Sequence, residues 1–182
     1  MTSQKRKRRV LAVSSGGGHW IQLQRLIPAF EDCDVAWATV DRAYRANLAR
    51  PDDRFYVLPD ATRWNKLALV HLMLKIALVI LRERPDVIIT TGAAPGYFAL
   101  VFGRLLRKRT CWLDSVANVD ELSLSGRKAS RWADLWLTQW KPVATETGPY
   151  YYGSVLSNLL DTTTTDSELQ SRSTKNDAPA ST

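Results

Sequence analysis

Three consecutive glycines precede a histidine in the stretch SSGGGHWIQLQRL, from Ser14 to Leu26. Glycine tolerates positive φ angles and lets a ligand approach the backbone closely. The apolar spacing after the glycines predicts a helix, and a helix N-terminus favours negative charge. The stretch therefore predicts a phosphate-binding loop, although a strand-to-helix turn without a ligand is also compatible with it. The candidate loop residues are Ser15, Gly16, Gly17 and Gly18.

His19 follows these glycines at the expected helix start. That position disfavours the imidazolium, so a neutral histidine there could act as a general base. Helix capping explains it equally well. His71 is the only other histidine in the chain, and no cluster of carboxylates accompanies either residue. We therefore expect no metal site and no cofactor.

Two further loops carry candidate binding residues. TTGAAPGYFAL combines small residues with the start of a helix, and an ordinary turn is the alternative interpretation. CWLDSVANVDELSLSGR places acidic and hydroxyl groups at a strand end, which suits sugar hydroxyls but also helix capping. The candidate acceptor- or phosphate-binding residues in these loops are Thr91, Gly92, Ala93, Pro95, Gly96, Asp114, Ser115 and Asn118.

A dinucleotide-binding fingerprint is an alternative for the first loop. Gly16 and Gly18 supply two of its three glycines, but Ile21 occupies the third position. Asp41 ends the second expected strand, where a ribose-binding acid belongs. The match is incomplete, so NAD(P) binding is the weaker hypothesis.

The elements that must position these loops alternate between strand and helix. Strands are predicted at 8–13, 34–40, 55–59, 86–92, 109–115 and 133–140, with helices after the glycines and at 64–84, 97–107 and 126–132. This alternation predicts an α/β fold, a Rossmann-like parallel sheet with helices on both faces. Ligands of such sheets bind at the carboxyl ends of the strands, where all the candidate loops fall.

Composition indicates one globular domain. The chain has 182 residues, 45% of them hydrophobic, and a net charge of +7. We expect a basic arm at 1–9, a domain at 10–157 and a disordered polar tail at 158–182. The block Lys5–Arg9 suits nucleic acid, anionic lipid or a solubilising end. The absence of a signal-peptide pattern argues against secretion, and the two cysteines suit a reducing compartment.

The predicted helix at 64–84 is apolar nearly all round. His71, Lys75 and Arg82 make a narrow polar stripe, and the first two interrupt the run of about 20 apolar residues that a transmembrane span requires. Both a buried helix and a helix lying in a membrane interface fit this pattern.

The motifs SSGGGHWIQLQRL, DVIITTGAAPG, WLDSVANVDELSLSGR, ADLWLTQW and PYYYGSVL occur in the order found in a family of glycosyltransferase subunits. Over about Val10–Leu156 the chain resembles that family. Its members are the acceptor-side subunit of the eukaryotic transferase that adds the second GlcNAc to the dolichol-linked oligosaccharide (asparagine-linked glycosylation protein fourteen) and bacterial exopolysaccharide proteins of the PssD type. The resemblance implies the fold of the N-terminal half of a GT-B glycosyltransferase.

The resemblance also implies a function. The chain would be the acceptor-binding, membrane-associated subunit of a two-subunit inverting glycosyltransferase, inactive alone. A small catalytic partner subunit would hold the UDP-sugar, and the acceptor would be a lipid-diphosphate-linked saccharide. Attachment would be peripheral, at the cytoplasmic face of the membrane, with no nucleic-acid partner. A non-catalytic membrane adaptor that recruits the catalytic subunit is the alternative.

Carried over by position, Gly16–His19 match the family's first glycine loop and Thr91–Gly96 its second. Asp114 and Ser115 match the polar loop facing the cleft. Two features depart from the family. Eukaryotic members have an N-terminal membrane helix where this chain has a basic arm, and many bacterial relatives place a basic residue where this chain has Asn118.

Overall fold

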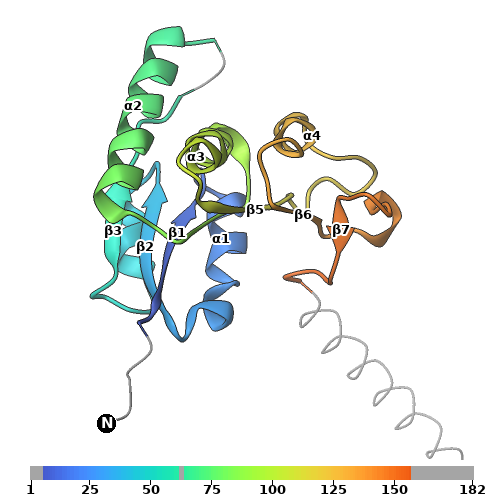
Figure 1. Ribbon diagram of the computed structural model, residues 1–182, viewed down its shortest axis with the longest axis horizontal. Helices are drawn as coiled ribbons and strands as arrows, with labels where there is room; N and C mark the ends of the chain where they lie inside the picture. Colours follow the sequence, from blue (N-terminus) through green and yellow to red (C-terminus); the bar gives the residue numbers. More distant parts are fainter. Residues whose placement is uncertain (1–5, 62–63, 157–182) are drawn as a thin grey trace, which may run out of the picture.

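The computed structural model describes residues 6–61 and 64–156. This part of the chain contains one parallel sheet in the order β3-β2-β1-β4-β5-β6-β7 (Figure 1). The expected Rossmann-like parallel sheet is therefore confirmed. Its strands are β1 (Arg8–Val13), β2 (Cys33–Thr39), β3 (Arg54–Val57), β4 (Val87–Thr90), β5 (Arg109–Leu113), β6 (Leu135–Thr138) and β7 (Tyr150–Tyr151).

Helices cover both faces of this sheet, with α2 and α3 on one side and α1 on the other (Figure 1). Short 3₁₀ turns occupy several of the connections. The helices are α1 (Gly18–Gln24), α2 (Lys66–Glu83), α3 (Ala93–Leu105) and α4 (Leu124–Ala129), with 3₁₀ turns η1 (Ile27–Phe30), η2 (Arg42–Asn47) and η3 (Lys141–Val143).

The core follows from the alternation of side chains along the central strands. Leu11 and Val13 of β1 belong to the apolar cluster beneath α2 and α3. The intervening Val10 and Ala12 pack on the opposite face, in the cluster that includes Trp20 of α1. Because β1 is buried on both faces, packing holds its carboxyl end in place, and with it the start of the loop that follows.

The start of α3 differs from the sequence prediction. The helix begins at Ala93 rather than near Tyr97, with Gly92 as its N-cap. Proline is tolerated in the first turn of a helix, where its missing N–H has no intrahelical partner. Ala93, Pro95 and Gly96 are therefore part of the helix, and their assignment to a loop was wrong.

Helix α2 is buried on one face and exposed on the other, so the expected buried helix is confirmed for one face only. One face, which includes Leu72 and Ile76, is buried against the sheet. The opposite face exposes an apolar row, the α2 stripe, made of Leu67, Val70, Leu74, Leu78 and Leu81. No helix among the described residues is long and apolar enough to cross a bilayer.

The basic arm is only partly within the described residues. Arg6 forms an ion pair with Asp86 at 2.8 Å, while Arg8 and Arg9 already belong to β1. The arm therefore touches the domain at the amino end of β4. Residues 1–5 and the whole predicted tail at 158–182 lie outside the described residues.

Candidate functional site

The loops after β1, β4, β5 and β6 meet at the carboxyl edge of the sheet. His19 contacts Thr91 across the β1 and β4 loops. Gln22 contacts Ser115 in the β5 loop, and Gln139 after β6 contacts both Gln22 and the β5 loop. Candidate residues far apart in sequence are thus brought to one edge.

His19 and Thr91 are joined by two reciprocal hydrogen bonds. The Nδ1 of His19 lies 2.7 Å from the carbonyl oxygen of Thr91, and the Thr91 hydroxyl donates to the carbonyl oxygen of His19, also at 2.7 Å. A carbonyl oxygen only accepts, so Nδ1 must carry the hydrogen. In the neutral ring the lone pair then belongs to Nε2. In that tautomer Nε2 is free to accept a proton.

Gly92 makes room for the His19 ring. Its φ is 125°, and a Cβ built on it would lie 3.0 Å from Cε1 and 3.2 Å from Nδ1 of His19. Any side chain at this position would therefore meet both backbone strain and the imidazole. The contact links the second glycine loop directly to the first.

The glycines of the first loop are not equivalent. Gly17 has a φ of 63° and donates its N–H to the Tyr44 hydroxyl at 2.8 Å. A Cβ on Gly16 would approach that same hydroxyl at 3.2 Å, whereas Gly18 has only Gln22 Nε2 nearby, at 3.9 Å. The Ser15 carbonyl accepts from the hydroxyl of Thr39. Backbone geometry thus requires glycine at position 17 alone.

In the second loop, one backbone N–H group is already occupied by a hydrogen bond within the loop. The Gly92 N–H donates to the Thr90 hydroxyl at 3.0 Å. A Cβ on Gly96 would lie 1.9 Å from that hydroxyl, so Gly96 allows α3 to pack tightly on β4. The amides left for an anion are those of Ala93 and Ala94 in the first turn of α3, since first-turn N–H groups have no intrahelical acceptor.

Asp114 is buried and holds the β5 loop together. Its carboxylate accepts four hydrogen bonds and is 2% exposed. A Cβ on Gly126 would lie 2.4 Å from its Oδ1, so α4 begins tightly against this carboxylate. Four donors already surround its oxygens, so Asp114 serves first to fix the loop. Those donors are Trp112 Nε1, the Asn118 side chain, and the backbone N–H and hydroxyl of Ser123.

A buried pair of amide side chains, Gln22 and Gln139, connects the loops. Gln22 donates to Ser115 Oγ and accepts from the backbone N–H of Val116. Its Oε1 also accepts from Gln139, 2.8 Å away, whose Nε2 reaches the Asp114 carbonyl. A glutamine inside the apolar register of α1 was the available signal, since a polar residue on a buried face needs partners.

Further observations on individual groups bear on the chemistry of this domain. The Ser14 hydroxyl, fully buried at the end of β1, has no hydrogen-bond partner among the described residues. Burial raises the pKa of the Cys111 thiol to about 12, so this cysteine is not a thiolate nucleophile. Within 6–61 and 64–156, no group of three metal-binding side chains is assembled.

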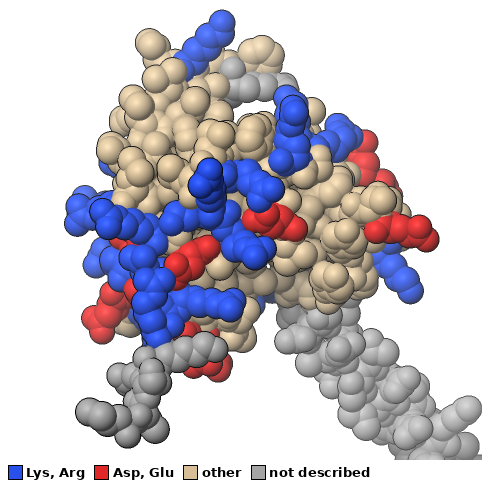
Figure 2. All heavy atoms as spheres, viewed as in Figure 1, with Lys and Arg blue, Asp and Glu red and all other residues tan. Residues whose placement is uncertain are grey.

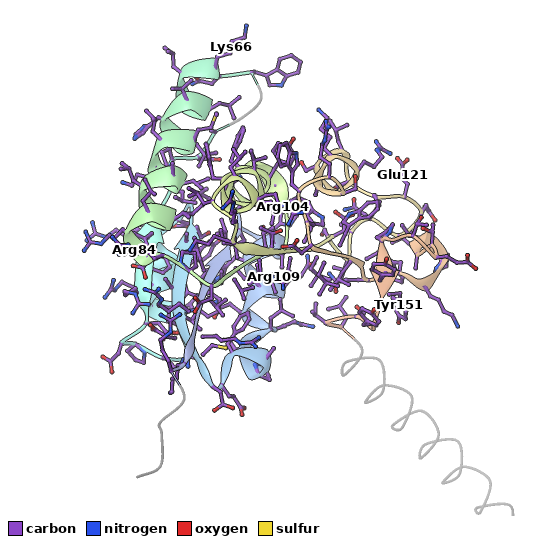
Figure 3. All side chains as sticks on the ribbon, in the orientation of Figure 1. Lys66, Arg84, Arg104, Arg109, Glu121 and Tyr151 are labelled. Carbon is purple, nitrogen blue, oxygen red and sulfur yellow. The ribbon has the colours of Figure 1, made fainter. Side chains whose placement is uncertain are left out.

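Sizeable hollows also occur at the opposite, amino edge of the sheet. One of about 500 Å³ and one of about 420 Å³ share Arg109 and Asp134 in their linings. Arg104 already pairs with Asp134 there, at 2.5 Å. Figure 2 shows Lys and Arg side chains gathered on this face, where Figure 3 labels Arg84, Arg104 and Arg109. Ligands of parallel sheets bind at the carboxyl edge, so we place the site there.

Comparison with known proteins identifies the fold. No protein-family profile and no curated protein sequence matches the chain. Among solved structures, MurG of Acinetobacter baumannii matches with a TM-score of 0.63 and 12% identity, over 81% of this chain and 45% of that protein. The UDP-N-acetylglucosamine 2-epimerase of Rickettsia bellii matches with a TM-score of 0.64 and 13% identity, over 88% and 48% respectively.

The solved structures that resemble this chain have GT-B glycosyltransferase-like folds. This chain has the fold of one GT-B half-domain. It spans less than half the length of either of those proteins. At such low identity the likeness establishes the fold alone, so the function of this GT-B half-domain must be argued from its own residues.

Proposed function

We propose that this GT-B half-domain is the acceptor-binding, membrane-associated subunit of a two-subunit inverting glycosyltransferase. The reaction moves a sugar from a UDP-sugar to a lipid-diphosphate-linked saccharide, and a separate catalytic partner subunit holds the nucleotide. The observation that carries the proposal is the pair of His19 and Thr91, which sets the histidine tautomer at the carboxyl edge of the sheet. The sequence resemblance supplies the identity of the two substrates.

His19 is the general base in this reaction. Its Nε2 takes the proton of the acceptor hydroxyl while that oxygen attacks the anomeric carbon. The bond between the anomeric carbon and UDP breaks as the new glycosidic bond forms on the opposite face. UDP leaves with the electron pair, and the proton remains on His19 until it passes to solvent.

The first turn of α3 supports binding of the acceptor diphosphate. This turn lies next to His19, because Gly92 directly precedes the helix and lies against the imidazole. A helix of 13 residues also carries a dipole that favours negative charge at this end. Helix α1 has only seven residues, so we assign the diphosphate to α3.

The α2 stripe supports peripheral attachment to the cytoplasmic face of a membrane. Exposed apolar rows of this kind mark membrane or protein contacts. Figure 2 shows a mostly uncharged surface over α2 at the upper left, with a basic side chain at its top and Lys and Arg side chains gathered below it. Such basic residues are attracted to anionic lipid.

Replacement of His19 tests the catalytic part of the proposal. His19→Ala should slow sugar transfer by roughly 10²–10⁴-fold, the usual contribution of a general base. The measurement is transfer to a lipid-linked acceptor by the assembled complex, with partner binding and the melting temperature measured alongside. His71→Ala is the matched control, since that histidine is exposed on α2.

The adaptor alternative makes the opposite prediction for the same variant. A subunit that only recruits and orients its partner does not need an imidazole at the carboxyl edge. If His19→Ala retains full transfer while partner binding is intact, His19 is a structural residue and the chain is an adaptor.

A further inference from the structure

An apolar pocket lies between α2, α3 and α4, near their amino ends. Its volume is about 260 Å³. In Figure 1, α3 lies between the other two helices, and their contacts agree with that arrangement. The side chains that line it are mainly apolar: Leu69 of α2, Ala94, Tyr97 and Phe98 of α3, and Leu124, Ser125 and Lys128 of α4.

One cation stands at the border of this pocket. Lys128 is exposed and forms no ion pair within the described part of the chain. Its neighbour Arg127 is instead paired with Glu121 at 2.9 Å, and Figure 3 shows Glu121 on the side of α4 away from α3. The pocket thus combines an apolar interior with a positive charge that no described carboxylate neutralises.

The pocket and the candidate site share the first turn of α3. Ala94, which lines it, is the second residue of α3, two positions after the Gly92 that contacts His19. A molecule with a phosphate at the start of α3 can therefore place an attached apolar group in the pocket. Lys128 lies in the lining of the same pocket, and its ammonium group would neutralise that phosphate.

The pocket also borders the α2 stripe. Leu69, in its lining, lies between Leu67 and Val70, which are both exposed. The amino end of α2, marked by Lys66 in Figure 3, stands clear of the sheet. An apolar chain leaving the pocket along α2 would thus meet the surface that we assign to the bilayer.

We propose that this pocket binds the part of the acceptor's lipid chain next to the diphosphate, with Lys128 facing the phosphate. The inference rests on the proposed function, because that function supplies a lipid-diphosphate acceptor. The pocket holds the chain segment nearest the charged group, while the remainder stays in the bilayer. Recognition of the acceptor then includes its lipid as well as its sugar.

Binding of two probes to the full chain tests this assignment without donor, partner or membrane. Farnesyl diphosphate, kept below its micelle concentration, should bind about tenfold or more tightly than inorganic diphosphate, since burial of apolar surface adds affinity. Ser125→Trp should fill the pocket. The affinity for farnesyl diphosphate should then fall to that for inorganic diphosphate. Ser130→Trp, at the exposed carboxyl end of α4, is the matched control and should keep the tenfold difference.

Two further variants locate the ligand. Lys128→Gln should weaken both probes by a similar factor, because it removes charge and leaves the apolar lining. Leu105→Asp, at the exposed carboxyl end of α3 and outside the pocket lining, should leave both affinities unchanged. Equal affinity of the two probes overturns the proposal, as does a preference for farnesyl diphosphate that survives Ser125→Trp in a folded variant or disappears in Leu105→Asp.

Failure of this inference is separable from failure of the proposed function. If the complex transfers sugar but the chain shows no preference for farnesyl diphosphate, the pocket assignment alone is wrong. If the preference and its Ser125 dependence hold but no complex transfers sugar, the transferase assignment is wrong and a lipid-phosphate site remains.

Discussion

At the residue scale, a few side chains decide whether the first loop can present His19. The carbonyl oxygen of Thr91 accepts a hydrogen bond from the imidazole, and Gly92, which has no side chain, leaves space for the ring. Neither interaction is visible in the sequence, because His19 lies far from both residues along the chain, 72 positions from Thr91. The glycines themselves could be identified from the sequence as a loop, because three in succession before a helical pattern indicate either a tight turn or a ligand-binding backbone.

Replacement of individual glycines tests how the first loop is built. Gly17→Ala should lower the free energy of unfolding by about 1–3 kcal/mol, because its φ of 63° is strained for a residue with a Cβ. Gly18→Ala is the matched control and should leave stability unchanged or slightly raised, since it opens α1 and has open space around it. Chemical unfolding measures both. Equal losses in the two variants would show that Gly17 is not the constrained position.

Asp114 shows the limit of residue-level prediction. An aspartate after a strand end was a reasonable candidate for binding sugar hydroxyls. In the fold its oxygens meet donors from Trp112, Asn118 and Ser123. Which donors approach a carboxylate depends on how the following loop folds back, and a single sequence does not contain that information. Its role toward the acceptor stays a prediction.

At the element scale, the strands were easier to predict than the helix starts. The β-branched run of β4 and the apolar run of β1 are typical of buried parallel strands. The start of α3 was misplaced because the glycines and proline around it favour turns locally. Packing of Gly96 against Thr90 overrides that preference. The pairing of β7 with β6 was missed because β7 has only two residues.

The amino end of β4 carries a testable pH dependence. Asp86 accepts a hydrogen bond from the Arg9 backbone N–H and pairs with Arg6, and the first of these contributes most to lowering its pKa. A carboxyl whose pKa falls on folding stabilises the protein above its unfolded pKa, about 3.9 for aspartate, and loses that contribution as the pH drops through the folded value.

Asp86→Asn should therefore destabilise the protein at neutral pH by about 1 kcal/mol or less, because the pair is partly exposed. The difference from the parent protein should shrink as the pH falls below about 4. Urea unfolding across this range measures it. Asp120→Asn, at an exposed residue with no hydrogen bond or ion pair to other described residues, is the control and should match the parent throughout. A deficit in Asp86→Asn that stays constant with pH would mean that the charge of Asp86 is not involved.

We predict that two features attach the protein to a membrane: its basic residues and the apolar α2 stripe. High salt should release part of the protein from vesicles with anionic lipid, because salt screens the basic residues and leaves apolar insertion intact. Leu74→Asp, on the α2 stripe, should weaken vesicle binding about tenfold or more. Val119→Asp makes the same change at an exposed residue outside α2 and should have little effect. Flotation with vesicles measures all three. Retention of the parent protein in alkaline carbonate would contradict a peripheral attachment.

At the scale of the whole molecule, alternation of strand and helix predicted the sheet, since parallel strands require crossover helices. The convergence of the β1, β4, β5 and β6 loops at one edge follows from that topology. What the sequence could not supply is the buried connection between those loops. Gln22 and Gln139 meet only because α1 packs beside the end of β6.

The most direct test of the account is sugar transfer by the purified chain and by its complex. Radiolabelled UDP-sugar is incubated with a lipid-diphosphate-linked acceptor, and the label that enters the lipid phase is measured. We predict none with this chain alone, because in the proposed enzyme a separate subunit binds the nucleotide. Label should appear when a protein carrying that nucleotide-binding half is added, and His19→Ala should suppress it. Robust transfer by the purified chain alone would contradict the two-subunit account.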